Sequence, residues 1–403
     1  MNLDNRKREV QLEAGKAWID SGCKGTIELN TGGGKTFIAF DAMLTLPKGS
    51  TVLFLAETTQ REKDVIDDSK VYLSFFGINL LHHVDFEFAC YQSAYKWKGR
   101  HFDLVIGDEI HSGTSKEYFK FFKNNTYNKI LCLTATRNEK VKYFIDGKIV
   151  TKGELIESIA PVCYTYGIAD AQREGTGRKL DIHIIEHQLE SVKREIIGGS
   201  KLKPFMNTEK RQYEYWDKLF IKGIEEENFK LTKVAVSKRS RLLYSLPSKI
   251  ESTRKLLKYV TGKSIIFNND LDALEKVTPN VVSAPRHGRS KKEQDEFNSI
   301  LRENFDKGHI RTIGSFKVLQ QGANLKQLDN VILMSYDSKS GGYQQKIGRL
   351  RKNLDKRGKV FMFVTQDTVE VDWYNKIVSD FPMEEFNVIR HMGVDECIEY
   401  LKQ

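Results

Sequence analysis

The sequence has few cysteines, no long hydrophobic run and no apolar leader. Its cysteines form no C-x-x-C pair, which argues against a disulfide scaffold or a zinc site and favours reduced, buried thiols in a cytosol-like compartment. No apolar run approaches the length of a membrane span, and residues 1–7 lack the apolar centre of a signal peptide. We therefore expect a cytoplasmic protein with no membrane partner. The five cysteines are Cys23, Cys90, Cys132, Cys163 and Cys397.

Acidic residues are outnumbered by basic ones. The chain has 64 Lys and Arg against 54 Asp and Glu, a net charge of +10 at pH 7. A basic excess favours a polyanionic partner, with nucleic acid as the leading candidate, although a merely solubilising surface is equally consistent with charge alone. Its 403 residues are enough for two or three domains.

A glycine-rich stretch, E-L-N-T-G-G-G-K-T at residues 28–36, is the strongest local signal. An apolar run before it predicts a strand over 25–29, and residues 37–44 have helical spacing, so the setting is that of a phosphate-binding loop. Glycines let backbone N–H groups converge on phosphates, Lys35 adds a positive charge, and the Thr36 hydroxyl can ligate magnesium. The first glycine of G-x-x-x-x-G-K-[ST] is replaced by Leu29. The stretch predicts ATP and Mg2+.

Strand-like runs continue through the first part of the chain, at 51–56, 86–91, 102–107 and 128–133. Near-continuous apolar strands of this length indicate a parallel sheet covered on both faces, so we expect an α/β domain ending near residue 165. Before the loop, residues 8–21 have the spacing of an amphipathic helix. It carries Gln11, whose amide offers the donor and acceptor that an adenine edge requires, although an exposed helix residue is the simpler reading.

Two polar motifs follow neighbouring strands. D-E-I-H at 108–111 follows an apolar strand, where open α/β sheets bind ligands. Asp108 is the candidate magnesium ligand and Glu109 the candidate base for the attacking water. L-T-A-T at 133–136 follows the next strand. Its hydroxyls, Thr134 and Thr136, either hydrogen-bond the acidic motif or cap a helix, and the sequence leaves this open.

Residues 166–245 change in character. Lys, Arg, Glu and Gln dominate and strand patterns disappear, so we expect a helical linker or accessory segment. Basic residues surround four aromatic ones there: Tyr213, Tyr215, Trp216 and Phe220 lie among Lys210, Arg211, Lys218 and Lys222. Such aromatics either pack within the segment or stack on bases.

A second α/β pattern occupies residues 246–403. Strands are predicted at 263–267, 280–283, 310–314, 330–334 and 359–364, with helices at 291–306 and 343–352. This half has no phosphate loop; it carries Q-G-A-N at 321–324 and Y-Q-Q-K-I-G-R-L-R-K at 343–352. The second of these presents Gln345 and Arg349 as candidate contacts to a nucleotide, with a basic surface helix as the alternative.

Taken in order, these motifs resemble those of superfamily 2 helicases over most of the chain. Gln11 is similar to the adenine-reading Gln of that family, and the absence of a first glycine at Leu29 is common in it. The matching segments are T-G-G-G-K-T, D-E-I-H, L-T-A-T, Q-G-A-N and Q-K-I-G-R, for motifs I, II, III, V and VI. The R-x-x-Q opening, Tyr91-Gln92-Ser93 and Leu246-Pro247-Ser248-Lys249 resemble the phage UvsW-like and XPB-like branch-migration group.

The resemblance implies two RecA-like domains with parallel sheets, 1–165 and 246–403, joined by the helical basic segment 166–245, with ATP and Mg2+ in the interdomain cleft. It implies catalytic roles for Lys35, Glu109, Gln345 and Arg349, and metal binding by Thr36 and Asp108. Nucleotide binding is implied for Gln11, Thr31, Gly32, Gly33, Gly34, Lys35, Thr36, Gly322, Asn324, Arg351 and Lys352, and coupling for His111, Thr134 and Thr136.

Two departures from the family pattern leave questions open. The second arginine of motif VI is expected where Lys352 stands, with Arg351 one position earlier, so either residue can be the second finger. Motif III continues with Arg137 instead of proline. Few residues precede Gln11, so we expect no separate N-terminal DNA-binding domain.

The function implied is that of an ATP-dependent DNA helicase or translocase, which unwinds or remodels forks and recombination intermediates through sequence-independent backbone contacts. We expect a monomer, and the resemblance suggests a phage-encoded protein acting in the host cytoplasm. Two alternatives stay open. The D-E-I-H tetrad suggests a DEAH-like RNA helicase, and a non-hydrolysing nucleic-acid-binding module has the same composition.

Overall fold

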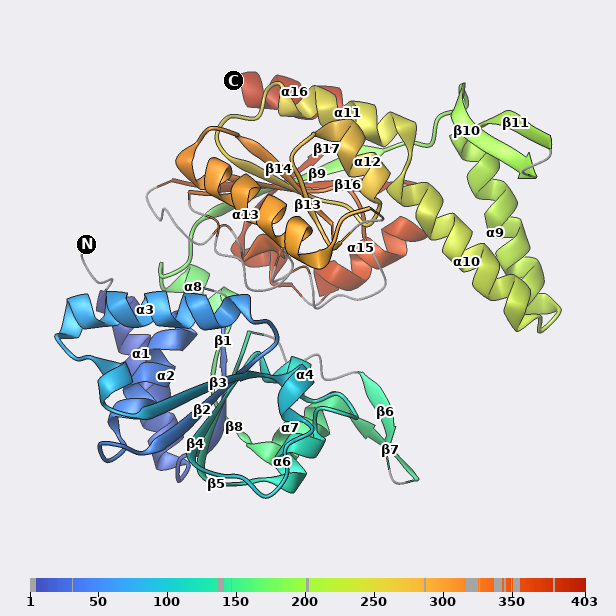
Figure 1. The fold of residues 1–403 in the computed structure, drawn as a ribbon. Coiled ribbons are helices and arrows are strands. Elements are labelled where there is room, and N and C mark those ends of the chain that lie inside the picture. Colours follow the sequence, from blue (N-terminus) through green and yellow to red (C-terminus); the bar gives the residue numbers. More distant parts are fainter. Residues whose placement is uncertain are drawn as a thin grey trace. The chain divides into compact units, whose positions relative to one another are not determined.

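The chain folds into two compact units, Met1–Gly177 and Arg178–Gln403. The computed structural model describes residues 5–30, 32–135, 141–145, 147–200, 203–285, 288–316, 325, 327–336, 343, 346–348, 350, 356–379 and 381–403 (Figure 1). Within these ranges no helix is both long and apolar enough to cross a membrane.

The first unit is built on a six-stranded parallel sheet in the order β3-β2-β4-β5-β1-β8. The predicted strands of this part are all present, and β8 adds one that was not predicted. The elements are α1 (Asn5–Asp20), β1 (Lys24–Leu29), α2 (Lys35–Leu44), β2 (Thr51–Ala56), α3 (Gln60–Phe76), η1 (Leu80–His82), β3 (Asp85–Cys90), α4 (Tyr91–Ala94), β4 (His101–Asp108), α5 (Ile110–Gly113), α6 (Lys120–Asn124), β5 (Thr126–Thr134), β6 (Lys142–Ile145), β7 (Lys148–Thr151), α7 (Lys152–Ile159), β8 (Val162–Tyr166) and α8 (Ile168–Arg173).

Helices cover both faces of this sheet, which explains its near-continuous apolar strands. Along β2, Val52 and Phe54 belong to a core that includes residues of α1, α2 and α3. Leu53 and Leu55 belong to a second core that includes residues of α4, α6 and α7. Successive side chains of a strand point to opposite faces, so each face needs its own apolar set.

The parallel arrangement places the carboxyl ends of the strands at one edge of the sheet. The glycine-rich loop follows β1 there, α3 begins four residues after β2, Asp108 ends β4, and Thr134 ends β5. Residues far apart in the sequence are thereby collected along this edge.

The second unit contains a seven-stranded parallel sheet in the order β13-β14-β12-β15-β16-β9-β17. Helices α11, α12 and α16 pack on one face, and α15 lies on the other (Figure 1). The elements after β9 and the arm are α11 (Pro247–Leu257), β12 (Ser264–Phe267), α12 (Leu271–Val277), β13 (Val281–Ser283), α13 (Lys291–Lys307), β14 (Thr312–Phe316), β15 (Asn330–Leu333), β16 (Gly358–Thr365), α15 (Val369–Ser379), η2 (Met383–Glu385), β17 (Asn387–His391) and α16 (Val394–Lys402). All five predicted strands of this half are present.

The expectation that strands are absent from residues 166–245 is wrong. Within it, β9 (Leu180–His187) is an interior strand of the second sheet, between β16 and β17. Its sequence, L-D-I-H-I-I-E-H, interrupts the apolar run with charged and imidazole side chains, which hides the strand pattern. The segment also provides two further strands, and its residues after Gly177 belong to the second unit.

Residues 193–244, here called the arm, project from the second unit (Figure 1). The arm consists of an antiparallel hairpin, β10 (Lys193–Ser200) and β11 (Lys203–Thr208), followed by two long helices, α9 (Glu209–Glu225) and α10 (Phe229–Tyr244). The helical prediction is therefore confirmed for α9 and α10. Phe229, the first residue of α10, is 86% exposed, so the arm carries an unburied aromatic ring where α10 begins.

A buried polar network, here called the arm-base network, connects the start of α9 to the start of α11 and to the segment that follows β9. Glu209 is fully buried and accepts hydrogen bonds from the Ser248 backbone N–H at 2.8 Å, the Ser248 hydroxyl at 2.6 Å and the Glu190 backbone N–H at 3.0 Å. The adjacent Lys249 ammonium donates to both carboxylate oxygens of Glu370, at 3.0 and 2.8 Å, and neither side chain is more than 1% exposed. Charged groups survive such burial when they are paired and hydrogen-bonded.

Candidate nucleotide site

The loop after β1 has the backbone that its glycines allow. Gly32 and Gly34 have φ of 96° and 87°, in the left-handed region that side chains disfavour. A Cβ on Gly33 would lie 2.6 Å from Leu29 Cγ, and one on Gly34 would lie 2.2 Å from Gln11 Nε2. Leu29, the residue in place of the first glycine, thus packs beneath the loop. The predicted strand, loop and helix are confirmed for residues 24–30 and 32–44.

Gln11 lies against this loop. It is 4% exposed, so the interpretation as an exposed helix residue is wrong. Its Nε2 donates to the Gly33 carbonyl at 3.0 Å, and its Oε1 accepts from Arg8 Nη1 at 3.2 Å. Arg8 is itself held by both carboxylate oxygens of Asp41, at 2.6 and 2.8 Å. In this conformation the Gln11 amide supports the loop, and its reading of adenine stays a prediction.

Lys35 links the loop to the acidic motif. It is the first residue of α2, and its Nζ donates to the Leu29 carbonyl at 3.2 Å. The same ammonium lies 3.6 Å from Glu109 Oε1. The predicted phosphate-binding cation and the predicted water-activating carboxylate, which are 74 positions apart in the sequence, are therefore neighbours in the structure.

The two predicted metal ligands, Thr36 and Asp108, share one hydrogen-bond partner. Arg61 Nε donates to Asp108 Oδ2 at 2.6 Å, and Arg61 Nη2 donates to Thr36 Oγ1 at 2.7 Å. One guanidinium therefore joins the hydroxyl and the carboxylate. Hard oxygen donors of these two kinds suit Mg2+, and their shared contact with a cation shows that this donor pair accommodates positive charge. The residues thus fit a divalent metal ion, which would be held by Thr36 and Asp108.

A group of polar side chains in mutual contact lies next to Lys35 and consists of Glu109, His111 and Thr134. His111 Nδ1 lies 3.0 Å from Thr134 Oγ1 and 3.4 Å from Glu109 Oε2, and the Thr134 hydroxyl and the Ala135 N–H each lie 3.4 Å from the same Glu109 oxygen. Burial lowers the pKa of His111, which favours its neutral form. Of the two possibilities for Thr134, contact with the acidic motif is the one realised. Glu109 itself has a φ of 48°, which turns the chain sharply after β4.

Several predicted site residues lie outside the described residues: Thr31, Thr136, Gly322, Asn324, Gln345, Arg349, Arg351 and Lys352. Their roles stay predictions. Among their described neighbours, Tyr343, Lys346, Ile347 and Leu350 are at most 3% exposed. The Lys346 ammonium lies 4.3 Å from the centroid of the Tyr343 ring, so this lysine is a packing residue of the second unit.

Sequence reasoning gave no role at the acidic motif to three residues that hold it. They are Arg61, Tyr91, whose hydroxyl donates to the Asp108 carbonyl at 3.0 Å, and Lys152, whose ammonium donates to the His111 carbonyl at 2.7 Å. The available signal for Arg61 was its place just after β2, at the edge where open parallel sheets bind ligands. No comparable signal marked Lys152, which lies 41 positions after the residue it contacts.

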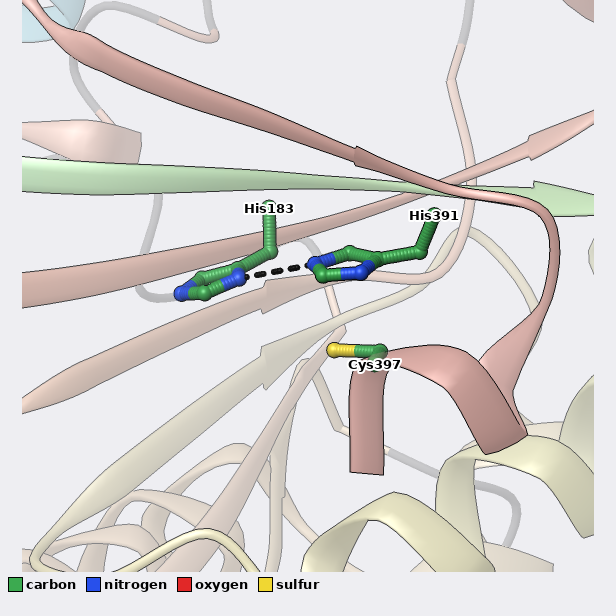
Figure 2. A group of neighbouring side chains, drawn as sticks. All are labelled: His183, His391 and Cys397. Atoms are coloured by element: carbon green, nitrogen blue, oxygen red, sulfur yellow. Dashed lines mark hydrogen bonds between the residues drawn. The ribbon is translucent and has the colours of Figure 1, made fainter. Parts of the chain in front are cut away.

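A separate buried cluster in the second unit joins His183 of β9, His391 of β17 and Cys397 of α16 (Figure 2). Their donor atoms lie within 4.8 Å of one another, a grouping that a transition metal can use. The two imidazoles already satisfy each other, however, because His183 Nδ1 lies 3.0 Å from His391 Nε2. His183 Nε2 is buried without a hydrogen-bond partner. Burying an unpaired nitrogen lone pair costs less free energy than burying an unpaired N–H donor, so we expect this nitrogen to carry no proton. A hydrogen-bonded pair of neutral histidines accounts for this arrangement.

This pair predicts a pH dependence of stability. Burial lowers the pKa of His183 to about 4 and also lowers the pKa of His391. An unfolded histidine binds a proton below its ordinary value of about 6.5, whereas the folded His183 does not until about pH 4. Stability should therefore fall as the pH drops through this window, by up to about 3 kcal/mol for this one group. The measurement is the denaturant midpoint of unfolding between pH 7.5 and 4.5.

The matched variant is His183→Phe, because the ring already stacks on Phe361 at a centroid distance of 4.9 Å. We expect this variant to bind about one proton fewer than the wild type on acid unfolding. His101→Gln, at an exposed position on β4, serves as the control and should leave the pH dependence unchanged. An unaltered acid profile for His183→Phe would show that the pair does not titrate as described.

Two family models match the chain. The model for the type III restriction enzyme res subunit matches residues 5–139, and the model for the helicase conserved C-terminal domain matches residues 248–353. The first range contains Gln11, the glycine-rich loop, D-E-I-H and L-T-A-T. The second contains Q-G-A-N and Q-K-I-G-R.

Known proteins similar to the chain include a DNA translocase, a protein solved with RNA and a nucleotide analogue, and a restriction-modification enzyme. The DNA 3'-5' translocase XPB2 of Sulfurisphaera tokodaii is 23% identical over 382 residues, which cover 90% of this chain and 82% of that protein. S. cerevisiae Dbp5 bound to RNA and ADP BeF3 has a TM-score of 0.60 at 12% identity, covering 98% of this chain and 92% of that one. The ATP-dependent type ISP restriction-modification enzyme LlaBIII bound to DNA has a TM-score of 0.58 at 13% identity, and the match covers 97% of this chain but 31% of that enzyme.

Proposed function

Because the chain belongs to superfamily 2 of the helicases, we propose that it is an ATP-dependent DNA translocase that unwinds or remodels branched DNA. The chain is a nucleic-acid-dependent ATPase with two RecA-like domains. The choice of DNA is supported by the similarity to a DNA translocase over 90% of the chain. Forks and recombination intermediates are the proposed substrates, through the UvsW-like and XPB-like segments of the sequence.

The main support for the ATPase mechanism is the distance of 3.6 Å between Lys35 Nζ and Glu109 Oε1. Lys35 and the loop N–H groups would hold the terminal phosphates of ATP. Thr36 and Asp108 would hold magnesium, which when bound neutralises the phosphate charge. Glu109 would accept a proton from the attacking water or orient that water.

The coupling of hydrolysis to movement is proposed to run through the acidic motif. Glu109 shares its Oε2 with His111 and with Thr134, at the ends of two neighbouring strands. A change at Glu109 during the reaction would therefore reach both strand ends. We further propose that Gln345 and Arg349 complete the ATPase site and that Arg349 stabilises the charge of the transition state. Contacts to DNA would be mainly to phosphates and hence salt-sensitive.

The test is ATP turnover measured with single-stranded DNA and RNA of equal length, followed by ATP-dependent unwinding of a forked DNA, a four-way junction, a blunt DNA duplex and an RNA duplex. We expect DNA to stimulate turnover more than RNA, and the fork and junction to be opened in preference to the blunt duplex. Preferential stimulation and unwinding with RNA would support a DEAH-like RNA helicase instead. Nucleic-acid binding without any ATP turnover would leave only a binding module.

A further inference from the structure

The Arg61 guanidinium makes its two shortest contacts with the two residues that are expected to hold magnesium. Its Nε and Nη2 donate to Asp108 and Thr36 over 2.6 and 2.7 Å, so one planar fork spans both oxygens. The Arg61 side chain is 19% exposed and the Asp108 side chain 6% exposed. Charge-assisted hydrogen bonds at such distances and burial are among the stronger polar contacts in proteins.

These contacts use the same oxygen atoms that a divalent cation would use. Asp108 Oδ2 and Thr36 Oγ1 cannot each bind a guanidinium and a metal ion at full strength, because both cations draw on the same acceptor lone pairs and would repel each other. Metal binding therefore requires the guanidinium to withdraw from at least one of the two oxygens. Any free energy that favours the Arg61 contacts is subtracted from the free energy of metal binding.

A second set of acceptors lies on the same helix. Asp64 and Asp68 are three and seven positions after Arg61 in α3, spacings that place side chains on one helix face. Asp68 Oδ2 is already 3.7 Å from Arg61 Nη1, and its side chain is 36% exposed. Arg61 thus has acidic partners toward which it can turn when it leaves Asp108 and Thr36, without losing every ion pair.

We propose that Arg61 is an internal competitor of the divalent metal, and that it sets the magnesium concentration at which the nucleotide site is loaded. The inference rests on the proposed function, since it takes Asp108 and Thr36 as metal ligands. Arg61 alternates between these two residues and the acidic face of α3. Arg61 affects the reaction only through the metal ligands and does not need to touch the reacting atoms. It is therefore a positioning residue.

The experiment measures equilibrium binding of fluorescently labelled ADP to the full chain over a series of MgCl2 concentrations, with no turnover involved. Arg61→Gln is expected to lower the half-saturating magnesium concentration roughly tenfold, the scale of one charge-assisted hydrogen bond. Binding in the presence of EDTA should change little. Asp68→Asn is expected to shift the magnesium requirement in the opposite direction, because it removes the alternative partner of Arg61.

Arg100→Gln is the matched control. Arg100 pairs with both oxygens of Glu87 at 2.9 and 2.7 Å in the same unit, so its loss removes a bidentate arginine–carboxylate pair away from the nucleotide site. It should leave the magnesium requirement unchanged. Thermal melting checks that each variant is folded, and if Arg61→Gln does not fold, Arg61→Lys, which keeps the charge without the fork, should give a smaller shift of the same sign.

The inference is overturned if the Arg61→Gln variant needs as much magnesium as the wild type. It is also overturned if the variant needs more magnesium, because that result would make Arg61 a direct ligand of the nucleotide. Lys35→Ala separates this failure from failure of the proposed function. If labelled ADP binds equally well to wild type and Lys35→Ala, the nucleotide site itself is wrongly placed and both proposals fall. If binding depends on Lys35 but not on Arg61, only the competition is refuted.

Discussion

Replacing Lys35 with alanine is expected to abolish nucleic-acid-stimulated ATP turnover while leaving the protein folded. The ammonium is the only charge in the glycine-rich loop stretch of residues 28–36 that can contact phosphates, because the other charged residue there is Glu28. Its removal costs little stability, since it donates to the Leu29 carbonyl and approaches Glu109, a side chain that is 27% exposed and can be solvated. The measurements are steady-state ATP hydrolysis with saturating DNA and a thermal melt. Unchanged turnover would refute the mechanism.

Glu109→Gln is the matched companion of this variant. Glutamine keeps the size of the side chain and its acceptor oxygen, but it cannot take a proton from water. We expect turnover to fall by about two to four orders of magnitude, the usual contribution of a general base. Nucleotide binding should persist, whereas Lys35→Ala should lose it. Equal losses of binding in both variants would place Glu109 among the binding residues and not at the chemical step.

Glu370→Gln is expected to destabilise the second unit by about 3–5 kcal/mol. The Lys249 ammonium would stay buried in the arm-base network, with its side chain 1% exposed and no carboxylate to neutralise it. The neutral amide would also weaken the contact in which Glu370 Oε2 accepts the Thr365 backbone N–H at 2.8 Å. Chemical denaturation followed by circular dichroism measures the loss, which should appear in the transition of the second unit.

A double variant distinguishes an unpaired charge from lost packing. Lys249→Met combined with Glu370→Leu removes both charges, so it should be more stable than either single variant. The exposed pair of Lys255 and Asp395, whose side chains are 50% and 73% exposed, provides the surface comparison. Asp395→Asn should cost less than about 1 kcal/mol. A Glu370→Gln variant as stable as Asp395→Asn would show that the buried pair is not held as the structure indicates.

Most strands of the two sheets and the glycine-rich loop could be predicted because their signals are local. A strand buried on both faces reads as a continuous apolar run, as in Val52 to Ala56, and a loop that binds phosphate needs glycines followed by Lys35. The order of the motifs along the chain then indicated the family. These signals do not depend on knowing which distant residues come into contact.

The remaining features depend on contacts between distant residues. Strand β9 contains Asp181, His183 and Glu186, which look like surface residues until the hydrogen-bonded partner of His183 is known to be His391, 208 positions later. Arg61 stands in a charged helix that reads as solvent-exposed. Only the fold shows that its guanidinium turns inward to Asp108. The role of such a polar side chain depends on the residues that it contacts, and those residues lie far away in the sequence.

The position of β9 also has a consequence for how the protein is made. Strand β9 is the first element of the second unit, yet it pairs with β16 and β17, whose residues follow it by more than 170 positions. The strand therefore leaves the ribosome long before its neighbours exist, whereas the six strands of the first unit are complete by Tyr166. During synthesis the first unit can fold before the second is complete. The apolar residues of β9 stay unpaired until β16 and β17 have been made, and in that interval they can bind chaperones or aggregate.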